Sequence, residues 1–278
     1  MSESQHSLLR KYGIRPVKKR GQNFLVDGNL ARAIARETLD VSDRVLELGA
    51  GAGALTVHLL DEAARVVCVE VDRHLCALLE AEFGEREKFQ LIEGDLAKLD
   101  WDGAVAAAGE RPVIAGNLPY VLTSKVLFAL ADLREVISGG VFMVQKEVAE
   151  RLVATPGGRD YGILAVVLGS VFDVKVVRKV APSVFWPKPE VESAIIRLTP
   201  KGAMPQAEFD QLASVVKTLF GQRRKKLRTQ LRVHFSLDDE AVNELAASTG
   251  VDVDRRPEQV GQDGFQRLAA ALTRRDEG

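Results

Sequence analysis

Three glycines and two acids in the first half of the chain could hold a small polar ligand. Gly49, Gly51 and Gly53 lie between an apolar run and a helical pattern, where small residues let the backbone approach a ligand. Glu70 ends the next apolar run, where a carboxylate can accept hydrogen bonds from both hydroxyls of a ribose. Asp95 follows a third run similarly and could take the amino group of an adenine. Together these features favour an adenosyl ligand.

The glycine spacing separates this segment from two familiar phosphate-binding loops. It is G-x-G-x-G, not the G-x-G-x-x-G of dinucleotide binders, and it does not contain the Lys-Ser/Thr of a P-loop. The natural adenosyl ligand is then S-adenosylmethionine, whose sulfonium and amino-acid ends need carboxylates and backbone groups rather than a phosphate cradle. The simpler alternative is that the glycines only make a tight strand-to-helix turn and that the acids cap helices.

A second chemical signal is the segment Asn117-Leu118-Pro119-Tyr120, which follows a fourth apolar run. It resembles the Asn/Asp-Pro-Pro-Tyr motif of methyltransferases that act on planar nitrogens, in the form found in ribosomal RNA adenine N6-methyltransferases. An exocyclic adenine amine is a poor nucleophile because its lone pair is delocalised into the ring. Oxygens of Asn117 and Leu118 could each accept one N6 hydrogen, while Tyr120 offers a stacking face to a base taken out of its helix. A simple turn is the alternative.

Further motifs narrow the resemblance to one family. Two segments are similar to motifs of the bacterial small-subunit rRNA adenine dimethyltransferases. They are Lys19–Asp27, which contains Gly-Gln-Asn-Phe-Leu, and the Pro-rich segment Pro182–Ser193. Phe220–Leu227 resembles the basic Gln-Arg-Arg-Lys helix start of the same family. The resemblance covers the chain from about Arg15 to Leu272, whereas the stretch Arg255–Gly264 matches only loosely.

The resemblance also implies roles for single residues. Cofactor binding is expected from Gln22, Asn23, Leu25, Gly49, Gly51, Glu70, Asp95, Leu96 and Asn117. Residues expected to orient the target amine or pack against the flipped adenine are Asn117, Leu118, Pro119, Tyr120 and Phe185, although Phe185 could instead anchor a Pro-rich hairpin. RNA binding is expected from Arg223, Arg224, Lys225 and Lys226.

The activity that this resemblance implies is S-adenosylmethionine-dependent dimethylation of N6 on two adjacent adenosines. The expected target lies in the 3'-terminal hairpin of 16S rRNA, within the small ribosomal subunit. The nearest alternative is a large-subunit rRNA adenine N6-methyltransferase of the macrolide-resistance type, which shares the adenosyl site but tends to be more basic. A binding protein with incidental methyl transfer is a third possibility, and a dehydrogenase would need the missing phosphate fingerprint.

Charge is unevenly spread along the chain, although the 38 Lys and Arg nearly balance the 39 Asp and Glu. Two segments without any acid, Ser4–Val26 and Gln211–Leu237, hold thirteen of the basic residues. A segregated basic surface suits a phosphate backbone because each neutralised phosphate releases counterions. A solvated basic helix face is the alternative.

The pattern of apolar residues predicts how these groups are positioned. β-branched runs at 44–48, 65–71, 89–93, 113–116, 141–145, 171–180 and 193–198 alternate with helical patterns, which predicts a mostly parallel α/β sheet. The Pro-rich loop between the last two runs favours an antiparallel strand at that edge. Helical patterns at 206–220, 223–235, 237–248 and 263–272 follow. We expect a Rossmann-like class I methyltransferase domain at 1–200 and a small all-α RNA-recognition domain at 201–278.

Composition excludes several other classes. The chain has 278 residues, of which 46% are hydrophobic and 28% charged, as in ordinary globular proteins. No run approaches the roughly 18 apolar residues of a membrane-spanning helix, and the start lacks a secretory pattern. Two cysteines and four scattered histidines give no metal-ligand spacing. We therefore expect a cytoplasmic monomer without a metal or a membrane partner.

Overall fold

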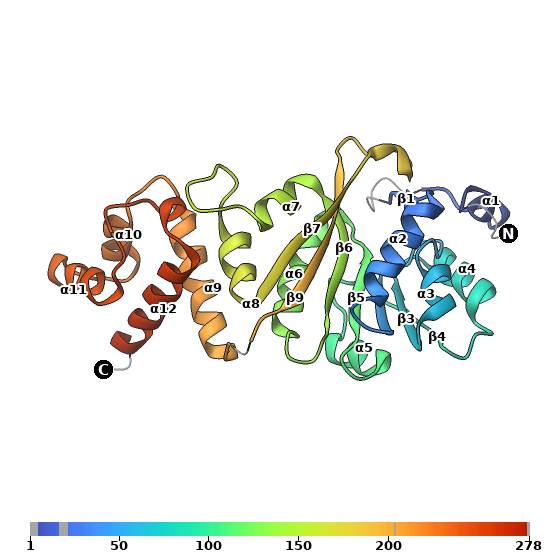
Figure 1. Ribbon diagram of the computed structural model, residues 1–278, viewed down its shortest axis with the longest axis horizontal. Helices are drawn as coiled ribbons and strands as arrows, with labels where there is room; N and C mark the ends of the chain where they lie inside the picture. Colours follow the sequence, from blue (N-terminus) through green and yellow to red (C-terminus); the bar gives the residue numbers. More distant parts are fainter. Residues whose placement is uncertain (1–4, 17–21, 203, 277–278) are drawn as a thin grey trace. The chain divides into compact units, whose positions relative to one another are not determined.

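The computed structural model describes residues 5–16, 22–202 and 204–276, and these form two compact units (Figure 1). The first unit comprises Met1–Ala149 and Val174–Pro200, and the second comprises Glu150–Asp173 and Lys201–Gly278. The sequence predicts a single boundary after residue 200. The structure instead groups residues 150–173 with the second unit, because the π-helix η3 (Leu164–Leu168) packs on helices of the C-terminal part.

A seven-stranded sheet forms the centre of the first unit. Its order is β4-β3-β2-β5-β6-β9-β7. The strands are β2 (Arg44–Leu48), β3 (Arg65–Glu70), β4 (Phe89–Glu93), β5 (Val113–Asn117), β6 (Gly139–Gln145), β7 (Phe172–Val180) and β9 (Ser193–Pro200). The pairs from β4 to β6 are parallel, and β9 runs antiparallel to β6. The mostly parallel sheet is confirmed, and its antiparallel strand lies one place in from the edge strand β7.

Helices connect the parallel strands and cover the sheet. They are α2 (Gly28–Leu39), α3 (Thr56–Glu62), α4 (Arg73–Phe83), α5 (Trp101–Ala108), α6 (Thr123–Asp132) and α7 (Lys146–Leu152), preceded by α1 (Gln5–Lys11). Alternate residues of β2, β3, β5 and β6 point to one face and pack in a single core with apolar residues of α2 and α3, including Ile34 and Leu59. The sheet edge therefore rests on a rigid apolar layer.

Two short strands join segments that lie far apart in the sequence. β1 (Phe24–Leu25) pairs antiparallel with β8 (Phe185–Trp186), so that Leu25 lies opposite Phe185. The single-turn helix η4 (Pro182–Val184) precedes β8. The Gly-Gln-Asn-Phe-Leu segment and the Pro-rich segment, which carry two of the family motifs, are thus neighbours in the first unit.

Helices build the second unit. They are α8 (Gly169–Val171), α9 (Gln206–Gly221), α10 (Leu227–His234), α11 (Asp239–Thr249) and α12 (Gln262–Asp276), with the single turn η5 (Pro257–Gln259) before α12. The prediction of a helix from Arg223 is wrong at its start, because residues before Leu227 form a turn. Helix α11 begins two residues later than predicted, since Asp238 caps it by accepting a 2.8 Å hydrogen bond from the Ala241 amide.

The described residues provide neither a membrane span nor a metal cluster. Over these ranges, no helix has the length and apolar character that crossing a bilayer demands. The same ranges contain no group of three or more His, Cys, Asp or Glu side chains that could hold a metal ion. Both cysteines, Cys68 and Cys76, are buried thiols.

Candidate active site

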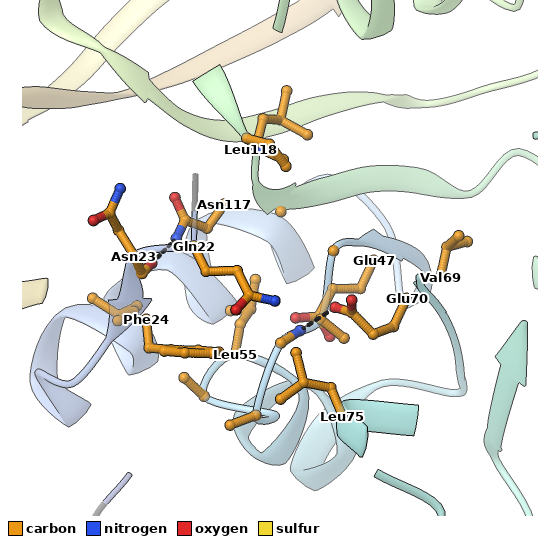
Figure 2. Close-up of a pocket in the computed structure, with 18 of the residues that line it drawn as sticks. Gln22, Asn23, Phe24, Glu47, Leu55, Val69, Glu70, Leu75, Asn117 and Leu118 are labelled. Carbon is orange, nitrogen blue, oxygen red and sulfur yellow. Dashed lines mark hydrogen bonds between the residues drawn. The ribbon is translucent and has the colours of Figure 1, made fainter. Parts of the chain in front are cut away.

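A pocket opens at the carboxyl edge of the sheet in the first unit (Figure 2). Strand β2 is flanked by β3 on one side and β5 on the other, and the chain order reverses there, which is where ligands bind in open α/β sheets. Every residue predicted to bind the cofactor lines this pocket, as do Leu118, Pro119 and Tyr120. The sequence pattern and the topology therefore agree on the location of the site.

The loop after β2 forms one wall of the pocket. Gly49, Gly51 and Gly53 have φ values of 67°, 59° and 78°, a left-handed conformation that favours glycine. The Gly49 amide donates a 2.8 Å hydrogen bond to the carbonyl of Val69 on β3. These constraints hold the loop in one shape, with its backbone exposed to the pocket.

Glu70 lies at the end of β3 and is almost fully buried, with 6% of its surface exposed. Its carboxylate accepts hydrogen bonds from the amides of Gly51 at 2.9 Å, Val71 at 2.9 Å and Asp72 at 3.0 Å. Figure 2 shows the bond from the glycine loop. Burial raises the pKa of Glu70, and the three amides oppose that shift. The carboxylate is thus fixed between the glycine loop and α4.

A second buried carboxylate, Glu47 on β2, also lines the pocket. Its Oε2 accepts hydrogen bonds from the Thr56 hydroxyl at 2.7 Å and the Cys68 thiol at 3.4 Å. Burial raises the pKa of Glu47 to about 7, against the opposing effect of these two bonds, and nearby Glu70 adds to the rise. Glu47 is missing from the predicted site, although strand alternation from Val45 places it on the core face under α3.

Asp95 and Gln22 lie at the pocket wall and also make local bonds. The Asp95 Oδ1 atom accepts a 2.8 Å hydrogen bond from the Ala97 amide, which closes a turn and does not cap a helix, because the next helix α5 begins at Trp101. Gln22 donates from its side-chain amide to Asp72 at 3.3 Å, which ties the segment before β1 to the start of α4. Apolar walls come from Leu75, Leu96 and neighbouring side chains.

Asn117 ends β5, and its side chain is oriented by the N-terminal segment. Its side-chain nitrogen donates a 3.0 Å hydrogen bond to the Asn23 carbonyl (Figure 2). The other end of the amide, its oxygen, is a hydrogen-bond acceptor. Asn117 can therefore accept from an amine in the pocket while the Asn23 carbonyl holds its nitrogen.

The residues around Asn117 restrict the backbone of the same segment. A side chain at Gly116 would place its Cβ 2.3 Å from the Leu48 carbonyl oxygen, so only glycine fits between β5 and β2. Leu118 is buried, and its amide donates to the Met143 carbonyl at 3.3 Å. The hydroxyl of Tyr120 lies 3.3 Å from that of Ser193 on β9. Strands β2, β6 and β9 therefore hold this turn.

Phe185 is the one residue of the predicted catalytic set that the structure does not bring to the pocket. Only 4% of its surface is exposed, and its side chain belongs to the main apolar core beside Leu25. This position matches the alternative, in which the ring anchors the Pro-rich hairpin. Stacking of Phe185 on a base remains a sequence prediction.

The four predicted RNA-binding residues lie in the second unit and differ from one another. Arg224, Lys225 and Lys226 are exposed, and Lys226 pairs with Asp254 at 3.5 Å. Arg223 is only partly exposed, and its guanidinium pairs with Glu258. Adjacent cations in the sequence thus have unlike environments.

Comparison with solved structures defines the class of fold. The chain superposes on a dimethyladenosine transferase from Plasmodium falciparum with a TM-score of 0.72, 23% identity, and coverage of 88% of this chain and 96% of that one. It superposes on the 23S rRNA methyltransferase ErmE with a TM-score of 0.68, 24% identity, and coverage of 90% and 100%. The sheet order and the sheet-edge pocket are those of a Rossmann-like methyltransferase.

Sequence comparison then gives the family. The family model for ribosomal RNA adenine dimethylase matches residues 15–271, so the chain belongs to this family. A ribosomal RNA small subunit methyltransferase A from Anaeromyxobacter sp. strain K is 44% identical over 92% of this chain and 93% of its own. The protein of the same name from Pseudomonas aeruginosa is 40% identical over 94% and 96%.

Proposed function

We propose that this protein transfers methyl groups from S-adenosylmethionine to N6 of two adjacent adenosines in the 3'-terminal hairpin of 16S rRNA, within the small ribosomal subunit. One observation carries the proposal. The residues expected to hold the cofactor and the segment expected to hold the target amine line a single pocket. Membership of the ribosomal RNA adenine dimethylase family supports the same reaction.

The residues of the pocket fit an adenosyl cofactor. The buried carboxylate of Glu70 suits ribose hydroxyls, and Asp95 suits the amino group of adenine. The glycine loop offers backbone groups without a phosphate-type cradle. Burial raises the pKa of Glu47 and of Glu70, and a bound ligand that carries positive charge would favour their ionised forms. When bound there, S-adenosylmethionine supplies an activated methyl group.

The chain's own residues would orient the target amine. In the first transfer, the oxygen of Asn117 accepts one hydrogen of the N6 amine and the carbonyl of Leu118 accepts the other, which directs the nitrogen lone pair out of the ring plane. In the second transfer the monomethylated amine has one hydrogen left for these acceptors. The bond from Asn117 to the Asn23 carbonyl keeps the amide in the required orientation. Tyr120 stacks on the extruded base.

The substrate assignment rests on relatives whose names specify the small subunit, including the proteins from Anaeromyxobacter and Pseudomonas aeruginosa. We infer that exposed cations of the second unit, Arg224 and Lys225, contact the RNA backbone. The protein then acts as a monomer in the cytoplasm, where ribosomal subunits are assembled. The large-subunit alternative shares the adenosyl site, and its solved representative resembles this chain in fold.

The test is incubation of the protein with labelled S-adenosylmethionine and small subunits that lack the modification, followed by reverse transcription. Two methyl groups on N6 block base pairing, so the proposal predicts a strong stop at two adjacent adenosines near the 3' end of 16S rRNA. Large subunits serve as the parallel substrate. Label in 23S rRNA with none in 16S rRNA would contradict the proposal and support the macrolide-resistance type.

A further inference from the structure

The segment Gln222–Lys226, here called the basic turn, is built in a fixed shape. Gln230 on α10 is fully buried, and its side-chain amide donates to the carbonyls of Gln222 at 3.3 Å and Lys225 at 3.2 Å. The Lys225 amide also donates to the Gln222 carbonyl at 2.8 Å. These bonds hold the backbone of the turn in one conformation.

Arg223 is directed from this turn toward a neighbouring loop. Its Nε atom bonds to the Glu258 carboxylate, and one Nη atom donates to the carbonyls of Arg159 at 2.7 Å and Gly158 at 3.4 Å. The Gly157 amide donates to the Glu258 carbonyl at 2.7 Å. Arg223 and Glu258 thus hold the segment Thr155–Arg159, here called the docked loop, against the basic turn.

A guanidinium is suited to this position because its planar fork can donate to a carboxylate and to two carbonyls at once. A lysine ammonium has no such fixed fork. The pair with Glu258 also removes much of the charge that Arg223 could offer to a phosphate. Arg223 therefore matches a structural tie more closely than a direct RNA contact.

The other cations of the basic turn, of the start of α10 and of the docked loop divide into two groups. Lys226 and Arg228 pair with Asp254 at 3.5 Å and 3.4 Å. Arg159, Arg224 and Lys225 are exposed and form no salt bridge within the part of the chain that the structure describes. The backbone carbonyl of Arg159 is bonded to Arg223, so this exposed residue lies next to the basic turn in the structure.

We propose that Arg159, Arg224 and Lys225 form one binding surface for an RNA phosphate backbone, and that Arg223 is the positioning residue that brings Arg159 into it. This inference rests on the proposed rRNA substrate and adds Arg159 to the RNA contacts. It also removes Arg223 from the direct contacts. The surface joins two segments about 65 residues apart, which a scan for basic runs does not reveal.

The test measures binding to unmethylated small subunits at several KCl concentrations with Mg²⁺ held constant. Affinity falls as the salt concentration rises, so log affinity plotted against log salt has a negative slope. Each lost phosphate contact lowers the magnitude of this slope by about one. Arg159→Ala should lower the slope by about one, and Arg223→Lys should lower it equally although the charge is kept. If Arg223→Lys retains the wild-type slope while Arg223→Ala loses one, Arg223 contacts phosphate directly and the proposal is overturned.

The double variant Arg159→Ala/Arg223→Ala makes the test sharper. Since Arg223 acts through Arg159 in this account, the double variant should lower the slope by about one, as either single variant does. Independent phosphate contacts would lower it by about two. Thermal unfolding and S-adenosylmethionine binding of each variant verify that the fold is retained.

The matched control is Arg275→Ala, which removes one cation of the same unit that pairs with Glu244 at 3.1 Å. Its slope should equal that of the wild type, and a fall of about one would mean that general charge sets the slope. Failure of the inference differs from failure of the proposed function. If the wild type methylates small subunits and Arg159→Ala shows the wild-type slope on them, only the inference is overturned. If the wild type methylates no small subunits, the proposed function is overturned.

Discussion

The sheet-edge pocket and the basic turn relate sequence to structure in opposite ways. In the pocket, residues from Gly49 to Asn117 are distant in sequence but line one cavity, because parallel strands bring their carboxyl ends to one edge. In the basic turn, adjacent cations diverge, because Arg223 is tied to the docked loop while Arg224 is exposed. Strand topology thus brings residues that are distant in sequence into one binding site. The turn, in contrast, places adjacent residues in different environments.

The largest expected effect is at Asn117. Asn117→Ala removes the oxygen that orients the amine, so methyl transfer should fall by about 10² to 10³-fold, while the dissociation constant for S-adenosylmethionine stays within a few-fold of wild type. Transfer is measured on small subunits and affinity by calorimetry. Parallel losses of transfer and affinity would place Asn117 in cofactor binding alone.

The buried acid Glu47, at the sheet edge, should make the free energy of unfolding depend on pH. The pKa of Glu47 is about 7 in the folded protein, above its ordinary value of 4.5, so the folded state binds more protons between these values. The contribution of Glu47 to the free energy of unfolding is fully present below pH 4.5 and is lost as the pH rises through 7. The change is on the order of 3 kcal/mol. Glu70, whose pKa is also raised, acts in the same direction.

Glu47→Gln is the matched variant for this prediction, because it keeps the shape but does not ionise. Denaturant unfolding at pH 5.5 and pH 8 should show a much smaller loss of stability in the variant than in the wild type. Equal losses in the two proteins would assign the pH dependence to other groups.

A smaller effect is expected at the ribose position. Glu70→Ala should weaken S-adenosylmethionine binding. Glu70→Gln keeps an acceptor oxygen for the Val71 and Asp72 amides but loses the oxygen that accepts from Gly51, and it should weaken binding by about 10 to 100-fold, equivalent to roughly 1.4 to 2.8 kcal/mol. Calorimetric titration measures the affinity. An unchanged dissociation constant in the folded Gln variant would remove Glu70 from the cofactor site.

The smallest effect is expected at Lys226, in the other region of the comparison. Its ammonium is exposed and pairs with Asp254, and exposed pairs of this kind contribute little to stability. Lys226→Ala should therefore change both the free energy of unfolding and the salt dependence of subunit binding only slightly. A loss of one full unit of salt slope would show that Lys226 belongs with Arg224 and Lys225.

Much of the fold could be predicted from the sequence because period-two and helical apolar patterns are strong in the first unit. Strands β2, β3 and β4 match the predicted runs closely. Helix α2 was not predicted, although its signal is present: Asp27 caps it by accepting from the Leu30 amide at 2.9 Å, and apolar residues follow at helical spacing.

The missed parts depend on tertiary contacts. Helix α10 starts late because the buried amide of Gln230 bonds to carbonyls of the preceding turn, and local propensity gives no sign of this. Phe185 is absorbed into the core through the pairing of β8 with β1, which joins segments about 160 residues apart. The pocket residues from Gly49 to Asn117, by contrast, follow strand ends and can be inferred from the strand pattern. Gln22, Asn23 and Leu25 follow only from the family resemblance.

The most direct test of the account is a crystal structure of the protein with S-adenosylmethionine. The account predicts that the nucleoside fills the sheet-edge pocket, with the ribose hydroxyls on Glu70, the adenine amine at Asp95, and the methyl group facing the side-chain oxygen of Asn117. A ligand bound elsewhere on the chain, with side chains closing this pocket, would contradict the account.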